Sequence, residues 1–230
     1  MSRMCERIDK IDTALQVREQ KIQTLLDNPE IGQHLIERHV SRNHYLFRQN
    51  APFSGLFIVK SGAFKLAKTT ADGREQITTF YYPTELIGYD AIHSQQHHAT
   101  LTALEESRVY EIRYANFVAV QQSSPAFQQY INEILSQHLH HEYNLANNAQ
   151  ALEKLAAFII NFIDRNRAVT KDQFQLPMCR DDIGSLLGLT AETVTRSLTT
   201  LKENNVVSCS GKRLSIMQYK KLLSFASITP

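Results

Sequence analysis

The residues best suited to chemistry lie at the start of a helix predicted over residues 191–204. Glu192, Thr195 and Arg196 share one face of that helix, and its apolar residues share the other. An Arg guanidinium can donate two hydrogen bonds to guanine N7 and O6, and a Glu carboxylate can accept one from cytosine N4. The methyl groups of Ala191 and Thr195 can touch the methyl group of thymine. These four side chains therefore suit the reading of base pairs in the major groove of DNA.

A helix-turn-helix is the element that would position these side chains. A first helix is predicted over 181–187, and Gly188 follows where that helix must end, because glycine adopts a left-handed conformation at little cost. Thr190 can cap the second helix. A strand–turn–strand pattern over 206–217 then adds a basic wing. A pair of helices with a merely solvated charged face is the alternative, and the turn, the cap and the wing together disfavour it.

Cationic and hydroxyl side chains surround the two helices and can bind phosphate, which gives affinity without sequence information. The formal net charge is only +2, but residues 161–230 hold ten Lys and Arg against six Asp and Glu, and the remainder holds fifteen against seventeen. Double-stranded DNA is therefore the expected partner. The residues assigned to phosphate are Arg180, Thr190, Thr193, Lys202, Lys212 and Arg213.

Composition places the chain among ordinary globular proteins of two modest domains, with 43% hydrophobic and 21% charged residues among 230. Cys5, Cys179 and Cys209 are far apart and odd in number, which fits a reducing compartment. No run approaches the ~18 apolar residues needed to span a bilayer, so the cytoplasm is expected and a membrane is not. Phosphate-cradling glycine loops, nucleophile elbows and spaced metal triads are absent from the sequence, so an enzyme is not expected.

Short apolar segments alternate with turn signals between residues 44 and 114, which predicts a small antiparallel barrel or jelly roll. The dipeptide Asp72-Gly73 between two such segments is a strong hairpin signal. The strands are predicted over 45–47, 56–59, 63–66, 77–82, 101–104 and 109–112.

Helices are expected on both sides of this region. One is predicted over 6–27, with a short helical stretch over 31–38, and residues 127–162 form one long helix or two in line. The apolar stripe of the long segment needs a partner, and a second copy of the chain would supply one, whereas packing on its own barrel is the alternative. The residues assigned to dimerisation are Ile131, Leu135, Leu139, Leu145, Ala149 and Leu152.

The fold class is therefore α+β: an N-terminal barrel or jelly roll, a long dimerisation helix and a C-terminal winged helix. The predicted division is a helical arm over 1–40, a β-roll over 41–120, the dimerisation helix over 121–160 and the DNA-binding domain over 161–230.

Five segments, ordered and spaced as in the family, resemble the CRP/FNR family of bacterial transcription regulators, and within it the FNR-type anaerobic regulators. They read FIVKSGAFKL, DGREQITTFYYPTELIGYDAI, ALEESRVYEI, EKLAAFIINF and RDDIGSLLGLTAETVTRSL, and the resemblance extends over 47–223. The resemblance implies that the N-terminal roll, over 41–120, is a sensory β-roll of the cyclic-nucleotide-binding type, and that the chain is a homodimeric activator. It also implies palindromic sites with TTGAT-like half-sites, read by a Glu-x-x-Ser-Arg pattern that stands here as Glu192, Thr195 and Arg196. Thr195 keeps the hydroxyl of that serine and adds a methyl group.

Two turn positions depart from the family pattern. Asn50 and Thr84 stand where glycines are usual. Asparagine tolerates a positive φ, whereas threonine is β-branched, so a modified turn is expected at Thr84.

A charged hairpin tip is the predicted contact with RNA polymerase, because activation in the family runs through loops of the roll. Its residues are Asp72, Gly73, Arg74 and Glu75. A plain solvated turn is the alternative.

The signal that the roll senses is not evident from the residues. An FNR-type iron–sulfur cluster needs about four cysteine thiolates, of which the family places three near the N-terminus and one in the roll. Here only Cys5 lies near the N-terminus, and Tyr110 stands where the cysteine of the roll would be. Family members that bind cyclic AMP hold the phosphate with an arginine, and the corresponding stretches here read 88-GYD-90 and 98-HAT-100. Neither the cluster nor cyclic AMP is therefore expected.

Histidines leave two further options. His97 and His98 are expected in a solvated loop. His138 and His141 share a helical face with Glu142, and such a trio could hold a metal. The preferred interpretation of this trio is a polar helix face near the dimer seam. Haem has no defining signature here. No cofactor is predicted, and control by abundance or by an unrecognised ligand is left open, with a cyclic-nucleotide or haem sensor of the same family as the alternative.

Overall fold

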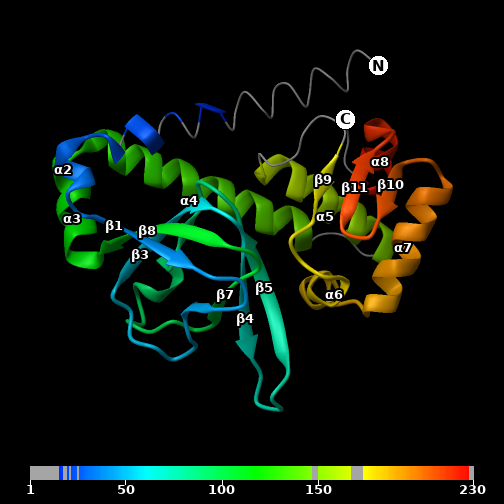
Figure 1. Cartoon of the computed structure of the whole chain (residues 1–230), viewed down its shortest axis with the longest axis horizontal. Coiled ribbons are helices and arrows are strands. Elements are labelled where there is room, and N and C mark those ends of the chain that lie inside the picture. The colour runs from blue at the N-terminus through cyan, green and yellow to red at the C-terminus, as the bar shows by residue number, and fades with distance from the viewer. Residues whose placement is uncertain are drawn as a thin grey trace. The chain divides into compact units, whose positions relative to one another are not determined.

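The computed structural model describes residues 16–17, 20, 22–24, 26–146, 150–166 and 173–227. The chain forms two compact units: residues 17–138, here the roll unit, and residues 139–230 together with the residues up to 16, here the C-terminal unit. Figure 1 labels their elements.

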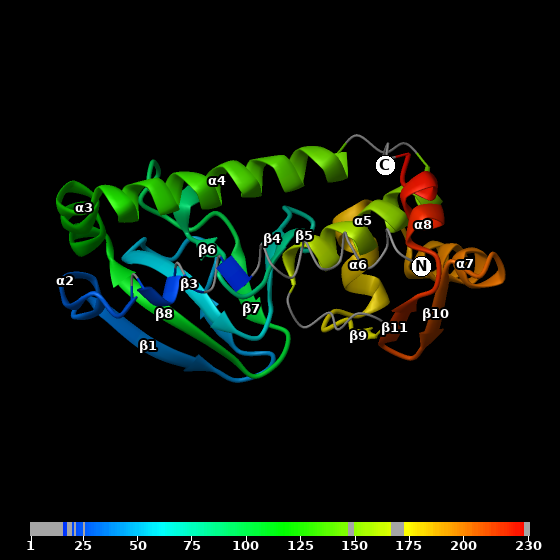
Figure 2. The same cartoon turned by 90° about the horizontal axis from the view of Figure 1, so that it is seen from above.

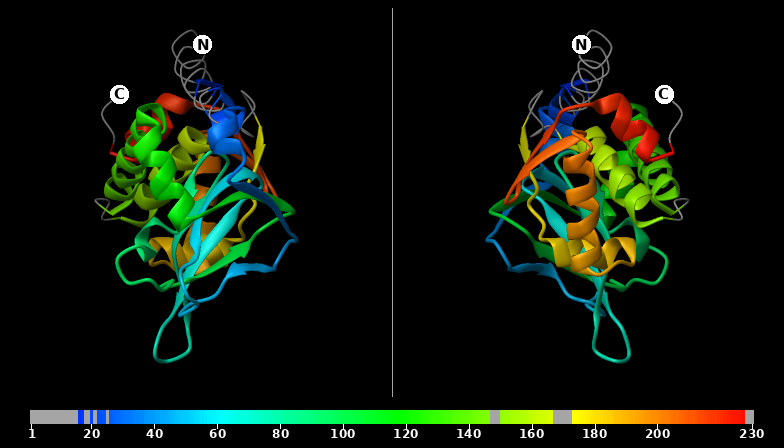
Figure 3. Two further views of the ribbon diagram at one scale, coloured as in Figure 1. Left: turned by 90° about the vertical axis from the view of Figure 1, so that its left-hand side faces the viewer. Right: turned by 90° about the vertical axis from the view of Figure 1, so that its right-hand side faces the viewer.

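The described strands of the roll unit form two antiparallel sheets (Figures 1 and 3). One sheet has the order β1-β8-β3-β6 and the other β2-β7-β4-β5. A short 3-10 helix, η1, covers Tyr89–Ala91. The strands are β1 Leu35–Val40, β2 Tyr45–Phe47, β3 Gly55–Ser61, β4 Phe64–Thr69, β5 Glu75–Tyr81, β6 Leu86–Ile87, β7 Thr100–Ala103 and β8 Ser107–Arg113.

Strand β3 contributes to two hydrophobic cores, because successive side chains of a strand point to opposite faces. Phe57 and Val59 belong to the core inside the roll, between the two sheets. Leu56 and Ile58 belong to a second core, which the helices of this unit help to form. Strand β3 is thus buried on both faces over residues 55–59, which explains why it reads as a continuous apolar run.

Three described helices belong wholly or partly to the roll unit: α2 Pro29–Gly32, α3 Tyr114–Ser123 and α4 Pro125–Ala146. Phe127, Tyr130, Ile131 and Ile134 on the first half of α4 are buried in the second core, and Figure 2 shows this half lying over the strands. This arrangement corrects one prediction. Ile131 is fully buried within its own roll, so it cannot lie at a dimer seam, and Leu135 packs against the same core.

The rest of the predicted seam is less covered. Leu139 is 67% exposed and Leu152 is half-buried, whereas the side chains of Leu145 and Ala149 lie outside the described residues. The long helical segment is divided into α4 and a separate helix α5, Ala151–Arg165.

The C-terminal unit combines helices with a three-stranded antiparallel sheet of order β10-β11-β9. Most of the apolar side chains of α5 are buried, which makes it the centre of this unit. No helix among the described residues combines the length and the apolar character that crossing a bilayer requires. The other elements are β9 Phe174–Gln175, α6 Arg180–Leu187, α7 Ala191–Glu203, β10 Val207–Ser210, β11 Arg213–Ile216 and α8 Tyr219–Phe225.

The predicted α+β architecture is confirmed, and the differences lie at the edges of the units. The helical stretch predicted over 31–38 is wrong beyond Gly32, because Leu35–Val40 form edge strand β1 and pair with β8. Strands β1, β6 and β9, helices α3 and α8 and the 3-10 helix η1 were not predicted. The helix predicted over 6–27 lies largely outside the described residues, and the domain boundaries stay predictions.

Asn50 and Thr84, which stand where the family usually has glycine, both adopt the left-handed backbone conformation that glycine adopts most readily. Asn50 has φ 67° and Thr84 has φ 76°. The modified turn expected at Thr84 is therefore not observed. Its N–H donates to the Val59 carbonyl at 2.8 Å and its side chain is buried, so the surrounding contacts hold the strained conformation.

Candidate nucleic-acid interface

The turn between α6 and α7 is fixed by two glycines. Gly188 ends α6 in the left-handed conformation, with φ 66°, as predicted. The N–H of Leu189 donates to the Gly184 carbonyl at 2.8 Å, and a Cβ on Gly184 would lie only 2.6 Å from the Leu189 oxygen. The backbone can return this tightly only because Gly184 has no side chain, a requirement that the sequence analysis missed.

Helix α7 begins with the predicted cap. The Thr190 hydroxyl accepts a hydrogen bond from the N–H of Thr193 at 3.1 Å, and the hydroxyls of Thr190 and Thr193 lie 2.9 Å apart. The cap satisfies an N–H at the first turn and fixes where α7 starts. Both hydroxyls lie at the N-terminal end of α7, where a phosphate would meet the positive end of the helix dipole.

Glu192 and Arg196 form an exposed pair on this end of α7. Arg196 Nη2 donates to Glu192 Oε1 at 2.5 Å, and the two side chains are 78% and 71% exposed. The contact joins residues four apart on one helical face. It keeps the carboxylate and the guanidinium side by side in solution, where both can exchange their mutual contact for base edges.

Thr195 is also held by hydrogen bonds. Its hydroxyl donates to the Ala191 carbonyl at 2.8 Å and accepts from Arg180 Nη1 at 3.1 Å. Arg180 was predicted to bind phosphate, but it lies against one of the predicted base-reading residues. The structure thus brings the first turn of α6 to the first turns of α7.

The wing tip contacts the segment that leads into α6. Lys212, in the turn between β10 and β11, donates to the Pro177 carbonyl at 2.8 Å, and Arg213 beside it is exposed. Lys202 is exposed on the last turn of α7, at the opposite end from Glu192. The predicted phosphate residues are therefore spread over both helices and the wing.

Cys179 has a structural role that the sequence analysis did not assign. It caps α6: its sulfur accepts from the N–H of Asp182 at 3.4 Å and donates to Asp182 Oδ2 at 3.0 Å. Burial, and then the hydrogen bond to Asp182, raise the pKa of the thiol. The residue is thus a cap in thiol form rather than a thiolate.

The predicted polymerase contact is an exposed hairpin tip between β4 and β5 (Figure 1). Asp72 accepts hydrogen bonds from the Thr70 hydroxyl and from Arg74, whose Nε lies 2.5 Å from Asp72 Oδ2. Both hydrogen bonds lower the pKa of Asp72, and the bond from Thr70 has the larger effect. Lys65 Nζ lies 3.2 Å from Glu75 Oε2 at the base of the hairpin. The tip is ordered by local charge pairs and stays accessible.

The segment predicted to face an effector differs from expectation. His97 is not in a solvated loop: it is 3% exposed, its ring stacks on Phe47 with centroids 3.6 Å apart, and its Nδ1 has no hydrogen-bond partner among the described residues. Burial lowers the pKa of this imidazole. His98 beside it is exposed, and so are Tyr89 and Asp90.

These residues do not fit a cyclic nucleotide. Holding its phosphate calls for a guanidinium and holding its ribose calls for an inward carboxylate, whereas His97 is packed among aromatic rings and Asp90 faces outward.

The residues do not fit an FNR-type cluster either. Tyr110 lies on β8 with Lys60 Nζ 4.9 Å from its ring centroid, and Cys179 is committed to capping α6 in the other unit. Among the described side chains, no three His, Cys, Asp or Glu residues gather as a metal site. His138 stacks on Tyr81 with centroids 5.7 Å apart, and the side chains of His141 and Glu142 lie outside the described residues.

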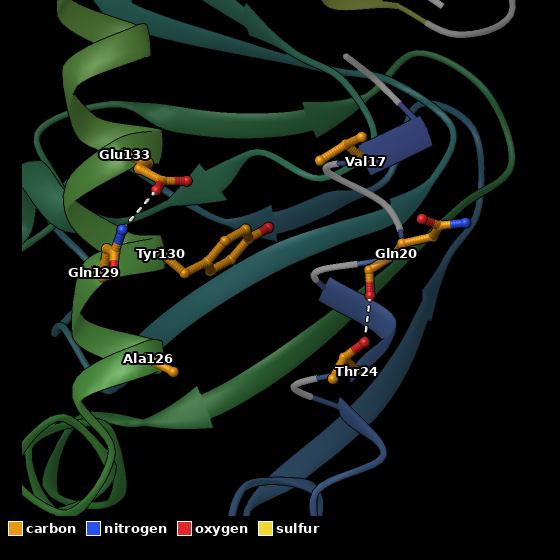
Figure 4. Close-up of a pocket in the computed structure, with 7 residues that line it drawn as sticks. All are labelled: Val17, Gln20, Thr24, Ala126, Gln129, Tyr130 and Glu133. Carbon is orange, nitrogen blue, oxygen red and sulfur yellow. Dashed lines mark hydrogen bonds between the residues drawn. The ribbon is translucent and has the colours of Figure 1, made fainter. Parts of the chain in front are cut away.

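A cavity of about 400 Å³ lies in the roll unit, beside the first half of α4 (Figure 4). Its described lining includes one carboxylate and no cationic side chain, and Gln129 Nε2 donates to that carboxylate at 3.2 Å. None of residues 88–100 is among the lining residues, which are Val17, Gln20, Thr24, Ala126, Gln129, Tyr130 and Glu133.

Comparison with known proteins places both units in one family. Residues 37–124 match the model of the cyclic nucleotide-binding domain, and residues 153–225 match that of the Crp-like helix-turn-helix domain. The transcriptional activator protein anr of Pseudomonas aeruginosa is 32% identical over 194 residues, which cover 82% of this chain and 80% of that protein. The fumarate and nitrate reduction regulatory protein of Vibrio cholerae is 32% identical over 213 residues, covering 89% and 85%.

A solved structure supports the fold independently. FixK2 from Bradyrhizobium japonicum superposes with a TM-score of 0.75 at 24% identity, over 85% of this chain and 99% of its own. The capped helix-turn-helix, the roll that precedes it and the relatives that share both agree: the chain belongs to the CRP/FNR family and is a DNA-binding transcription regulator.

Proposed function

We propose that this regulator binds, as a homodimer, palindromic DNA with TTGAT-like half-sites and reads each half-site with Glu192, Thr195, Arg196 and Ala191. The observation that carries the proposal is the exposed Glu192–Arg196 pair on the first turns of a capped helix. In a helix-turn-helix this part of the second helix meets base edges in the major groove. Relatives named as anaerobic and as fumarate and nitrate reduction regulators support the half-site class.

Two features support dimerisation: a palindrome presents two equivalent half-sites, and α4 carries an exposed apolar side chain. Two recognition helices related by a two-fold axis meet half-sites about one helical turn apart, ~34 Å. Leu139, the first residue of α4 that belongs to the C-terminal unit, offers an apolar side chain that is 67% exposed. We assign it to the seam, with Leu145, Ala149 and Leu152 continuing along the chain.

Phosphate contacts supply most of the affinity. Thr190, Thr193 and the N–H groups of the first turn of α7 lie at a helix N-terminus, and Lys212 and Arg213 lie on the wing. Lys202 adds a cation at the other end of α7.

DNA binding is proposed to require neither a cyclic nucleotide nor an iron–sulfur cluster. The supporting observations are that His97 stacks on Phe47, that Tyr110 lies against Lys60 and that Cys179 caps α6. No catalytic activity is proposed, and a regulator of the bacterial chromosome acts in the cytoplasm. Purification without oxygen, followed by an absorption spectrum and mass spectrometry, tests this: haem, a cluster or a co-purified nucleotide that is needed for DNA binding would contradict it.

Activation is proposed to run through the hairpin tip at Asp72, Gly73, Arg74 and Glu75, which would touch RNA polymerase. Its exposure and its internally paired charges support this role. Replacing Asp72 and Arg74 by alanine should lower transcription from a promoter carrying the site while leaving the Kd for that DNA unchanged. A loss of both together would assign the hairpin to folding instead.

The test of DNA specificity is a titration of a labelled duplex carrying TTGAT-N4-ATCAA. A specific regulator should bind it at least ~10³-fold more tightly than a scrambled duplex of the same composition at physiological salt. Equal binding to the two duplexes would overturn the proposed function.

A further inference from the structure

The hydroxyl of Thr195 has little capacity left for DNA. A hydroxyl has one proton to donate and two lone pairs that accept. In Thr195 the proton goes to the Ala191 carbonyl at 2.8 Å, and one lone pair accepts from Arg180 Nη1 at 3.1 Å. The hydroxyl therefore cannot donate to thymine O4 or to guanine unless it gives up the bond to Ala191. What the side chain has free for a base edge is its methyl group and one lone pair, which can accept a hydrogen bond but not donate one.

We propose that Arg180 is a positioning residue for base reading: with the Ala191 carbonyl it holds the Thr195 hydroxyl, so that Thr195 recognises thymine through its methyl group. The inference rests on the proposed function, because it needs α7 to lie in the major groove. It deepens that function by naming the chemistry of one contact and by assigning a residue outside α7 to specificity.

The arrangement explains two features of the sequence. Threonine is the residue that can satisfy Arg180 and also present a methyl group, whereas serine could do only the first and valine only the second. Arg180 lies on the first turn of α6, in the residue after the Cys179 cap. The cap fixes where α6 begins, and this sets the position of Arg180 relative to Thr195.

A pure phosphate role for Arg180 makes a different prediction. A guanidinium aimed at a phosphate would add affinity equally to every sequence and would raise the salt dependence of binding. A positioning residue changes instead the ratio between two DNAs that differ only where Thr195 touches them. Replacing thymine by uracil provides such a pair, because it removes the 5-methyl group and keeps the base pairing and O4.

The experiment measures Kd by fluorescence anisotropy for the TTGAT-N4-ATCAA duplex and for versions with each thymine in turn replaced by uracil in both half-sites. Burying one methyl-sized group is worth about a fourfold factor in affinity, so the sensitive position should lose about fifteenfold over two half-sites. Thr195→Ser should abolish this thymine-to-uracil ratio at that position, and Thr195→Val should retain it.

Arg180→Met should reduce the ratio at the same position, while the preference for guanine read by Arg196 stays. Lys202→Met is the matched control: it removes a cation from the last turn of α7, away from Thr195, so it should weaken all duplexes alike and leave the ratio unchanged. In the Thr195→Val background, Arg180→Met should no longer affect the ratio, because no hydroxyl is there to hold. Circular dichroism melts confirm that each variant is folded.

Two results would overturn the inference while leaving the proposed function intact. One is tight, specific binding with no thymine sensitive to uracil. The other is an Arg180→Met variant with an unchanged ratio and a lower salt slope, which would return Arg180 to phosphate binding. Equal binding of cognate and scrambled duplexes by the unaltered protein would instead contradict the proposed function itself.

Discussion

The start of α7 and the segment 88–100 of the roll are both places where a CRP/FNR regulator is expected to do chemistry, and they have opposite characters. At α7 the polar side chains are exposed and paired with each other, as Glu192 and Arg196 are at 2.5 Å. In the roll, His97 is 3% exposed and stacked on Phe47 with no partner for Nδ1 among the described residues. The first region offers its hydrogen-bonding groups to a ligand, whereas in the second the imidazole of His97 is buried by packing while His98, Tyr89 and Asp90 stay exposed.

The difference means that a role expected from the family has to be tested separately at each site. The relatives match both units, and the proposed base-reading residues lie in the unit that matches the Crp-like helix-turn-helix domain. Under the proposed function, the roll serves as a scaffold that positions α4 and the hairpin at Asp72.

The largest effect is expected from Leu139→Asp, because α4 is where the two copies should meet. Burying a leucine contributes ~1.5–3 kcal/mol, and a two-fold seam buries two of them, so the dimer should weaken by ~3–6 kcal/mol. Sedimentation equilibrium would show a shift to monomer at micromolar concentration, with a parallel loss of binding to the palindrome.

Ile131→Ala is the matched control for this change. Ile131 is fully buried in the core of its own roll, so its loss should destabilise that unit by ~2–5 kcal/mol in urea unfolding and leave the association constant of folded protein unchanged. A Leu139→Asp protein that remains dimeric would show that the seam lies elsewhere.

Arg196→Ala and Glu192→Ala should have the next largest effect. Each removes a base contact worth ~1–3 kcal/mol per half-site, so binding to the cognate duplex should fall while binding to scrambled DNA hardly changes. Anisotropy titrations with single base-pair changes would show relaxed preference at one position for each variant. An equal loss on both duplexes would mean that the pair binds phosphate rather than bases.

The parts of this molecule that the sequence predicts well are those specified by neighbouring residues. Gly188, the Thr190 cap and the apolar face of α7 act within one or two turns of the chain, and the structure confirms the turn and the cap. The hairpin at Asp72-Gly73 is confirmed for the same reason.

The parts that it misses depend on distant partners. Edge strand β1 has exposed residues on both faces, so its pattern lacks the alternation that identifies a strand, and only pairing with β8 defines it. The sequence shows the apolar stripe of α4, but its periodicity does not tell whether Ile131 packs against its own roll or against a second copy of the chain. His97 lies beside an exposed histidine, and its burial depends on Phe47, which is fifty residues earlier.

The buried imidazole should make stability depend on pH. The unfolded chain takes up a proton on His97 near pH 6.5, whereas burial lowers the pKa in the folded state. Between those two values the unfolded state binds more protons, so stability falls as the pH falls below about 6.5, by at most ~1.4 kcal/mol per pH unit from this residue.

His97→Phe should flatten this dependence, because phenylalanine can still stack on Phe47 and has no proton to gain. Urea unfolding of the two proteins between pH 5 and 8 measures the difference. A His97→Phe protein with an unchanged pH profile would place the titrating group elsewhere.

The smallest effect is expected at the wing, where a cation that only binds phosphate can be compared with the base-reading residues of α7. Lys212→Met removes a cation from the turn between β10 and β11. Its Nζ donates to the Pro177 carbonyl, a contact that ties it to no particular base. Its loss should weaken cognate and scrambled duplexes by the same factor and reduce the slope of log K against log salt by about one per protomer. Because neutralising one phosphate releases one condensed counterion, the slope counts such contacts directly. An unchanged slope would remove the wing from the DNA interface and leave the phosphate contacts to the helix N-termini.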